Sequence, residues 1–245
     1  MLIDCFPMFN EINMLRFRLN LLKDVVDKTV IVEANSTFSG KPKPLHFEQN
    51  RHLFKDYDIE HVVVSLPDQA DPWTRERIQR NAIKIGLDRV QPYPHDHVII
   101  SDLDELPDPE TLKHIKESQM VGMVALEQDL YYYHLECRAK GKWHKAKVCD
   151  METFCDIGEP ERVRHHSCPH QKRGGWHCSY FGDVAFVRQK LEAYSHQENN
   201  TERFKNHEHI MKCMRECKDL FDRGDGWDYI PLNRNPYLPP NWRAL

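Results

Sequence analysis

Short apolar segments alternate with helical patterns through the first 120 residues, and this alternation limits the fold more than any other feature of the sequence. The segments expected to form strands are Leu2–Phe6, 28–34 (KTVIVEA), 61–66 (HVVVSL) and the run that begins at His97 (HVII). After the first, apolar residues at 12, 15, 19 and 22 recur at helical spacing. The pattern predicts an α/β fold with a mostly parallel central sheet.

A second helix is expected just before the fourth strand. Asp71 is a suitable N-cap and Pro72 a suitable first residue, so the helix should run from there to about Leu87. Its apolar positions, Ile78, Ala82 and Ile85, are expected to be buried.

The alternation of strand and helix patterns ends after Val121, which predicts a second half of different architecture. Residues 121–135 and 145–151 look like longer strands, residues 158–183 are rich in loop-forming residues, and helices are expected near 184–194 and 201–222. The end of the chain, 224–242, is rich in Gly, Pro, Asn and aromatic residues and predicts irregular structure.

Composition excludes some classes of protein. The chain has 34 Lys and Arg against 38 Asp and Glu, a formal charge of -4, so we expect no nucleic-acid partner, although a phosphate-bearing small molecule stays possible. No segment approaches the ~20 apolar residues of a membrane span, which predicts a soluble, cytoplasmic chain, or a Golgi or ER luminal one if this is a trimmed domain. With eight sparse cysteines, we expect reduced thiols unless the chain is luminal.

Three acids, Asp102, Asp104 and Glu105, directly follow the fourth strand. Burying a carboxylate without compensation costs roughly several kcal/mol, so the acids should lie at the exposed strand end, in a strand-to-helix turn closed by Asp108 and Pro109. Strand alternation places Asp102 and Asp104 on the same side, an arrangement that suits Mg²⁺ or Mn²⁺ shared with substrate phosphates. The alternative is that these acids only cap the next helix and are solvated.

Other polar residues are placed to reach the same edge of the sheet. Asn10 and Glu11 follow the first strand, and Glu33 and Asn35 follow the second. On the helix from Pro72, two faces carry polar groups that could reach a phosphate or a base, or could simply be solvated: Arg77, Arg80 and Lys84 on one face, Arg75 and Gln79 on the other.

Several long motifs resemble those of the β-1,4-mannosyl-glycoprotein 4-β-N-acetylglucosaminyltransferase family, glycosyltransferase family 17, which contains the bisecting-GlcNAc transferases. They are the stretch 4–50 (DCFPMFNE to HFEQN), DPWTRERIQRNAIKIGL, IISDLDELP and GGWHCSYF, and the resemblance runs from about residue 3 to 235. The chain resembles a short microbial- or viral-type member without the membrane anchor of the animal enzymes.

The resemblance implies a GT-A-like fold and a metal-dependent, inverting transfer of a sugar with a β-linkage. The donor would be a UDP-sugar, UDP-GlcNAc in the best-known members, and the acceptor a hydroxyl of an oligosaccharide or glycoprotein. Mn²⁺ or Mg²⁺ would be held by the metal ligands Asp102 and Asp104. The residues expected to bind the donor are Asn10, Glu11, Glu33, Asn35, Arg75, Gln79, Arg80 and Asp102. The whole chain would be one domain, with residues 1–120 binding the nucleotide sugar and 121–245 facing the acceptor.

Two alternatives to this function remain open. The donor could be another UDP-sugar such as UDP-xylose, because a few pocket contacts decide that choice. The chain could also be a catalytically silent protein that binds a nucleotide sugar or a carbohydrate.

The segment 165–178 (HHSCPHQKRGGWHC) concentrates histidines and cysteines, but its spacing matches no usual structural zinc site. We expect a loop that lines the acceptor or sugar site. Its lining residues would be Gly174, Gly175, Trp176, His177 and Tyr180, with His177 able to meet the metal or the diphosphate. The alternative is a packed strand with a buried tryptophan.

An inverting transferase also needs a carboxylate base on the acceptor side. Asp183 is the first candidate, at the start of the helix expected near 184, although it could be only that helix's N-cap. Glu127 and Asp129 are the next candidates.

Overall fold

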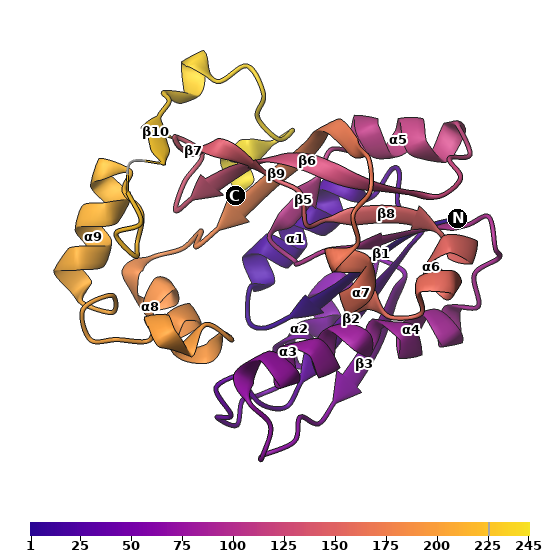
Figure 1. Ribbon diagram of the computed structural model, residues 1–245, viewed down its shortest axis with the longest axis horizontal. Coiled ribbons are helices and arrows are strands. Elements are labelled where there is room, and N and C mark those ends of the chain that lie inside the picture. Colours follow the sequence, from indigo (N-terminus) through magenta and orange to yellow (C-terminus); the bar gives the residue numbers. More distant parts are fainter. Residues whose placement is uncertain (225) are drawn as a thin grey trace.

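The fold is built around one ten-stranded mixed sheet. It is seen in a computed structural model, which describes residues 1–224 and 226–245 (Figure 1). Eight strands follow the order β10-β7-β6-β8-β4-β1-β2-β3, while β9 pairs with both β5 and β6. The strands are β1 Leu2–Met8, β2 Lys28–Ala34, β3 Ile59–Val64, β4 His97–Ile100, β5 Glu105–Pro107, β6 Met123–Tyr132, β7 Cys137–Trp143, β8 Lys147–Asp150, β9 His170–Ser179 and β10 Trp227–Tyr229.

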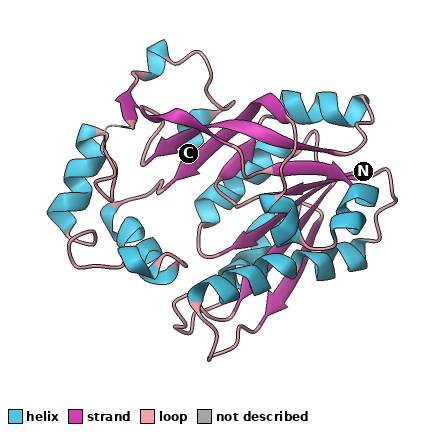
Figure 2. Ribbon diagram, in the orientation of Figure 1, coloured by secondary structure: helices cyan, strands magenta, loops and turns pink. Residues whose placement is uncertain are grey.

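Helices lie against both faces of the parallel part of this sheet, as Figure 2 shows. The α-helices are α1 Ile12–Leu22, α2 His46–Asn50, α3 Pro72–Asn81, α4 Ile83–Val90, α5 Pro109–Glu117, α6 Met151–Ile157, α7 Pro160–His165, α8 Val184–Ala193 and α9 His207–Glu216. Short 3-10 helices span η1 Arg51–Phe54, η2 Gln197–Asn199, η3 Leu232–Arg234 and η4 Trp242–Ala244.

Strand alternation explains why the parallel part has two cores. Ile3 and Cys5 of β1 point to the face covered by α4, α6 and α7, whereas Leu2 lies on the opposite face with Leu22 of α1 and Leu112 of α5. Strands β4, β1, β2 and β3 all run parallel, and the later strands are mixed. The prediction of an α/β fold with a mostly parallel first half and a mixed second half is confirmed.

Residues 170–179 form a ten-residue strand, β9, instead of the predicted loop. The strand is stabilised from both sides, by parallel pairing with β6 and antiparallel pairing with β5. Its glycines allow this close approach: a Cβ at Gly174 would lie 2.5 Å from the Glu127 nitrogen, and one at Gly175 would lie 2.0 Å from the Leu106 carbonyl oxygen. Turn-like composition hid a strand whose pairing partners are distant in sequence.

The helix predicted from Pro72 is divided in two and buries some residues other than those predicted. It breaks at Ala82 between α3 and α4; Ala82 is buried as predicted, whereas Ile85 is 44% exposed, contrary to the prediction. The residues of α3 that are buried are Arg75, Gln79 and Arg80. Burial of these polar groups is tolerated because each has several hydrogen-bond partners.

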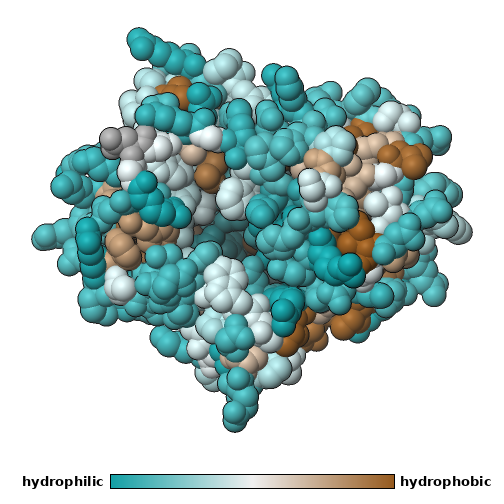
Figure 3. All heavy atoms as spheres, in the orientation of Figure 1, coloured by the Kyte–Doolittle hydropathy of each residue, from teal (hydrophilic) through white to brown (hydrophobic). Residues whose placement is uncertain are grey.

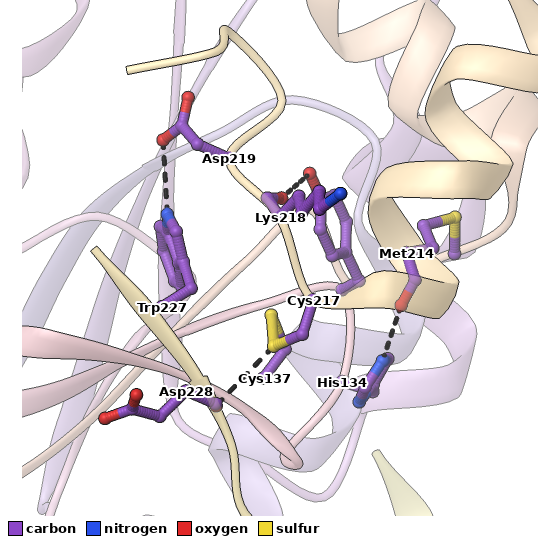
Figure 4. The surroundings of a disulfide bond; sticks show 9 residues. His134, Cys137, Met214, Cys217, Lys218, Asp219, Trp227 and Asp228 are labelled. Carbon is purple, nitrogen blue, oxygen red and sulfur yellow. Dashed lines mark hydrogen bonds between the residues drawn. A yellow bond between two sulfur atoms is a disulfide. The ribbon is translucent and has the colours of Figure 1, made fainter. Parts of the chain in front are cut away.

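Helices α8 and α9 form a separate layer beside β7 and β10. A disulfide joins Cys137 of β7 to Cys217 at the end of α9 (Figure 4), where the two Cα atoms lie 5.2 Å apart, within the range that a disulfide spans. The expectation of reduced thiols is therefore wrong for this pair. The helix expected over 201–222 is shorter, because Asn206 caps it at the start and Cys217 ends it in a left-handed conformation.

Candidate active site

A cleft of about 840 Å³ opens at the carboxyl ends of β1 and β4 and is closed on the other side by β9 and α8. On the face seen in Figure 3, the surface is hollowed between these two sides and is mostly hydrophilic around the hollow. Its lining residues include Met8, Glu11, Thr37, Lys43, Trp73, Glu76, Gln79, Arg80, Asp102, Asp104, Trp143, Lys145, Glu161, Arg164, His177, Tyr180, Lys190, Tyr194, Glu198 and Arg223.

The turn that carries the acids, residues 102–105 (here the DLDE turn), is held in place by a buried ion pair. Arg18 of α1 pairs with Asp4 of β1 at 2.6 Å, and both side chains are at most 1% exposed. The same guanidinium donates to the carbonyl oxygens of Asp102, Leu103 and Glu105 at 2.9, 3.1 and 2.9 Å. A fully paired, buried arginine thereby fixes the backbone of the turn.

Glu105 lies beneath the turn and is fully buried, which differs from the expectation that all three acids are exposed. Its cost of burial is offset by Arg164 of α7, which donates to both carboxylate oxygens at 2.8 Å. The indole of Trp143 and the backbone N–H of Asp102 also donate to Glu105. Glu105 therefore orients the site from behind and does not face the cleft.

Asp102 faces the cleft between two arginines. Its side chain is 32% exposed and pairs with Arg80 at 2.5 Å and with Arg164 at 2.6 Å. Burial alone would raise the pKa of Asp102, but the guanidinium groups of Arg164 and Arg80 lower that pKa to about 2. Asp102 is therefore ionised at neutral pH, as a metal or hydroxyl partner requires.

Asp104 lies deeper, is only 8% exposed, contrary to the expectation for these acids, and is paired across the cleft with α8. Its Oδ2 accepts a hydrogen bond from Lys190 at 2.7 Å, and its Oδ1 lies 3.5 Å from His177 Nε2. Although burial alone would raise it, Lys190 and then His177 hold the pKa of Asp104 far below its ordinary value. Burial opposes the charge of Lys190 too, but Asp104 and then Glu11 raise its pKa.

The donor set fits a divalent cation. Asp102 and Asp104 supply the hard oxygen atoms that Mg²⁺ and Mn²⁺ prefer, and His177 adds an imidazole that suits Mn²⁺. The Nδ1 atom of His177 is buried and has no hydrogen-bond partner among residues 1–224 and 226–245, so one nitrogen of the ring is left for a ligand to satisfy.

The residues predicted to bind the donor are only partly brought together. Glu11, Gln79, Arg80 and Asp102 line the cleft. Gln79 uses its amide group to bridge the carbonyl oxygens of Met8 and Val32, so it also ties β1 to β2.

The other four predicted donor residues lie elsewhere. Glu33 is fully buried and supports Lys43, which does line the cleft, at 3.5 Å. Arg75 is buried and donates to three backbone carbonyls. Asn10 donates to Gln189, and Asn35 donates to Ser65 at the surface.

Of the predicted sugar-lining residues, some line the cleft and others belong to the packed interior. His177 and Tyr180, at the end of β9, line the cleft. Trp176 is 1% exposed, packs on Tyr237 with ring centroids 4.6 Å apart and donates to its carbonyl oxygen, so it belongs to the core. Gly174 and Gly175 serve the strand packing described above. The alternative of a packed strand with a buried tryptophan thus describes the first part of this segment.

The three candidate bases occupy three different environments. Asp183 caps α8 by accepting from the Phe186 N–H at 2.8 Å, and it lines a second hollow of about 650 Å³ that shares Glu11 with the main cleft. Asp129 is 4% exposed and is paired with Lys142 and Arg138. Glu127, near the middle of β6, lies beside His144.

Several residues of the cleft were not identified from the sequence, above all Arg164, Lys190 and Trp143. The sequence did indicate one supporting residue, Arg18. Asp4 lies in a strand predicted to be buried, and a buried carboxylate needs a cationic partner. Lys190 and Arg164 gave no such signal, because their partners are 86 and 62 residues away along the chain.

Comparison with known proteins agrees with a transferase. The family model described as Glycosyltransferase family 17 matches residues 1–225, so the chain is a glycosyltransferase by class. It belongs to glycosyltransferase family 17, the family inferred from its motifs. No curated protein matches the chain.

Among solved structures, the chain is similar to the crystal structure of S. aureus TarS 1-349. The identity is 11% and the TM-score 0.44, over 88% of this chain and 71% of that one, and we draw nothing further from this likeness. Within the described residues, no helix has both the length and the apolar character needed to cross a bilayer.

Proposed function

We propose that this chain is a metal-dependent, inverting glycosyltransferase that moves a sugar, GlcNAc from UDP-GlcNAc in the simplest case, onto a glycan hydroxyl with a β-linkage. The observation that carries the proposal is the DLDE turn at the floor of the cleft, where two carboxylates face four cationic side chains: Arg80, Arg164, Lys190 and, when protonated, His177. A nucleoside diphosphate with a divalent cation fits this mixture of charges.

The metal would be held by Asp104 and Asp102, with His177 as the third candidate ligand. When bound, Mn²⁺ or Mg²⁺ neutralises charge that develops on the leaving diphosphate. The protein's own contribution is to keep Asp102 ionised through Arg80 and Arg164, to keep Asp104 ionised through Lys190, and to fix the backbone of both through Arg18.

Lys190 has a second role in this proposal. Its ammonium group pairs with Asp104 at 2.7 Å and also lies 4.0 Å from Glu11. With Asp104 as a metal ligand, the Lys190 ammonium would be available to a phosphate oxygen from the α8 side of the cleft. Lys190 would then hold the donor from the face opposite to Arg80.

The sugar has aromatic surfaces on which to rest. Tyr180 and Trp143 line the cleft, and the Trp143 ring lies 4.7 Å from that of His177. Trp73, 49% exposed, lines the mouth and meets His196 edge-on at 4.4 Å. Aromatic faces of this kind suit the apolar face of a pyranose.

For the base we propose Asp183, with Glu127 and Asp129 as the next candidates. Asp183 lines a hollow that shares one lining residue, Glu11, with the main cleft, and an acceptor bound in that hollow would lie beside the donor site. The carboxylate would accept the hydroxyl proton as the sugar–phosphate bond breaks. Asp129 is less suited, because Lys142 and Arg138 neutralise it.

A thermal-shift screen of nucleotide sugars, with Mn²⁺ and with EDTA, tests the proposal. A donor at a hundredfold over its Kd stabilises the fold by about 2.7 kcal/mol, so the correct one should be evident, and UDP-GlcNAc and UDP-xylose should differ. Slow, metal-dependent hydrolysis of the same UDP-sugar distinguishes the enzyme from a silent binding protein. A shift that is equal in Mn²⁺ and in EDTA, with no hydrolysis, would favour the silent binder.

A further inference from the structure

We propose that Glu127, His144 and His170 form a second metal site, outside the cleft, that binds one zinc-like transition-metal ion. One donor atom from each residue lies within 4.8 Å of the others, and the Glu127 Oε2 atom lies 3.7 Å from His144 Nε2. Ligand atoms about 2.0–2.1 Å from a tetrahedral zinc ion are about 3.4 Å apart. The existing arrangement needs only side-chain rotation to reach that spacing.

The three ligands are placed by three segments of one sheet. Glu127 is on β6, at the irregularity in its pairing with β9 between Leu126 and Gln128. His144 is in the turn from β7 to β8, and His170 is the first residue of β9, paired with Ala125. A β-bulge redirects a side chain, and ligands on paired strands are held more precisely than ligands on loops.

The side chains are also accessible and chemically matched. Glu127 is 26% and His144 33% exposed. The two histidine rings stack with centroids 4.1 Å apart, so at least one ring would turn for both to bind the ion, because a metal lies in the plane of each ligating ring. Two imidazoles and a carboxylate select Zn²⁺, Co²⁺ or Ni²⁺ over Mg²⁺ and Ca²⁺, and leave a fourth position for water. The segment 165–178 alone has no zinc spacing, but one of its histidines meets ligands from two distant segments.

This site is distinct from the DLDE turn but adjoins the cleft. Trp143 and Lys145 flank His144 in sequence and belong to the described lining of the cleft, where Trp143 also donates to Glu105. A bound ion would therefore anchor the turn that carries two cleft residues.

Titration with Co²⁺, followed by its visible absorption, tests the site in the whole chain. We expect one equivalent to bind with the strong visible bands of a tetrahedral ion, and Zn²⁺ to displace it. His170→Ala and Glu127→Gln should each weaken this binding by at least about tenfold, because they remove a direct ligand. Two controls should leave it unchanged: His166→Ala, an exposed histidine of the same segment, and Asp104→Asn, which alters only the DLDE turn.

Each other outcome contradicts the proposal. A wild-type chain with no visible bands, or His170→Ala and Glu127→Gln variants that bind like wild type, would overturn it. Loss of the bands in Asp104→Asn would move the ion to the DLDE turn. The activity of Asp104→Asn tests the proposed function separately, so the two proposals can fail independently.

Discussion

Two strands of the parallel sheet, β2 and β4, lie on either side of β1 and end in acids, and the two ends differ in what surrounds them. At the end of β2, Glu33 is fully buried and is enclosed by Lys43, His61 and the Phe47 N–H. At the end of β4, Asp102 and Asp104 are also paired with cations, but they line the cleft. An acid at a strand end thus serves the fold when it is enclosed, and is available for chemistry when its counter-charges border a cavity.

The largest expected effect on stability comes from the ion pair beneath the DLDE turn. Arg18→Met leaves Asp4 buried without a partner and frees three carbonyl oxygens, so we expect a loss of about 3–5 kcal/mol in the free energy of unfolding. Urea denaturation followed by circular dichroism measures it. Arg16→Met, on the exposed face of the same helix, is the control and should change stability by less than about 0.5 kcal/mol. If Arg18→Met lowered the free energy of unfolding no more than Arg16→Met does, the Arg18–Asp4 pair would not be needed to hold the DLDE turn.

The next prediction compares the loss of sugar transfer when an acid is changed at each of the two strand ends. Asp104→Asn keeps the side-chain shape but removes an anionic ligand, so sugar transfer should fall by about 10²–10³-fold while the fold survives. Glu33→Gln is the matched change at β2. Because Glu33 does not face the cleft, the rate of sugar transfer by the Glu33→Gln variant should change by less than about tenfold. The change would come mainly from a weaker interaction with Lys43. If Glu33→Gln proved as damaging as Asp104→Asn, the distinction between the two ends would be lost.

Asp183→Asn sharpens the account on the acceptor side. Asparagine caps a helix nearly as well as aspartate, so the melting temperature and UDP binding in Mn²⁺ should hold, while transfer falls by about 10²-fold if Asp183 is the base. Steady-state rates with a saturating donor give the measurement. Activity near wild type would leave Asp183 as a cap only, and Glu127→Gln and Asp129→Asn would be tested next.

The smallest effect is one of acid stability. Burial alone would raise the pKa of Asp102, yet its arginines lower that pKa to about 2, below the value of about 3.9 in an unfolded chain. The pairing of Asp102 with Arg80 and Arg164 therefore contributes stability that is fully present above about pH 4 and is lost as the pH falls toward 2. Asp102→Asn should flatten the dependence of melting temperature on pH in that window. A variant with the wild-type slope would show that other carboxylates control the acid transition.

The sequence predicted local features well and long-range ones poorly. Asp71 and Asp108 cap their helices as expected, and the apolar run at 97–100 is the strand that leads to the acids. Those features depend on neighbouring residues. Strand β9 and the Arg164 contacts depend on segments that meet only in the folded chain, so composition gave no direct sign of them.

The burial of the charged face of α3 shows the same limit in energetic terms. Arg80 interacts with Glu76, Asp102 and Glu161, and only the last two come from other parts of the chain. Hydropathy alone assigned this face to solvent or substrate, because it cannot count distant counter-charges. A buried arginine is favourable only once all of those partners are in place.

The central claim is that the DLDE turn binds a metal and a donor diphosphate together, and calorimetric titration of UDP tests it most directly. In Mn²⁺, wild type should bind UDP at least about tenfold more tightly than in EDTA, a difference of about 1.4 kcal/mol, and Asp104→Asn should lose that difference while remaining folded. Equal affinity in Mn²⁺ and EDTA for the wild-type chain would contradict the claim.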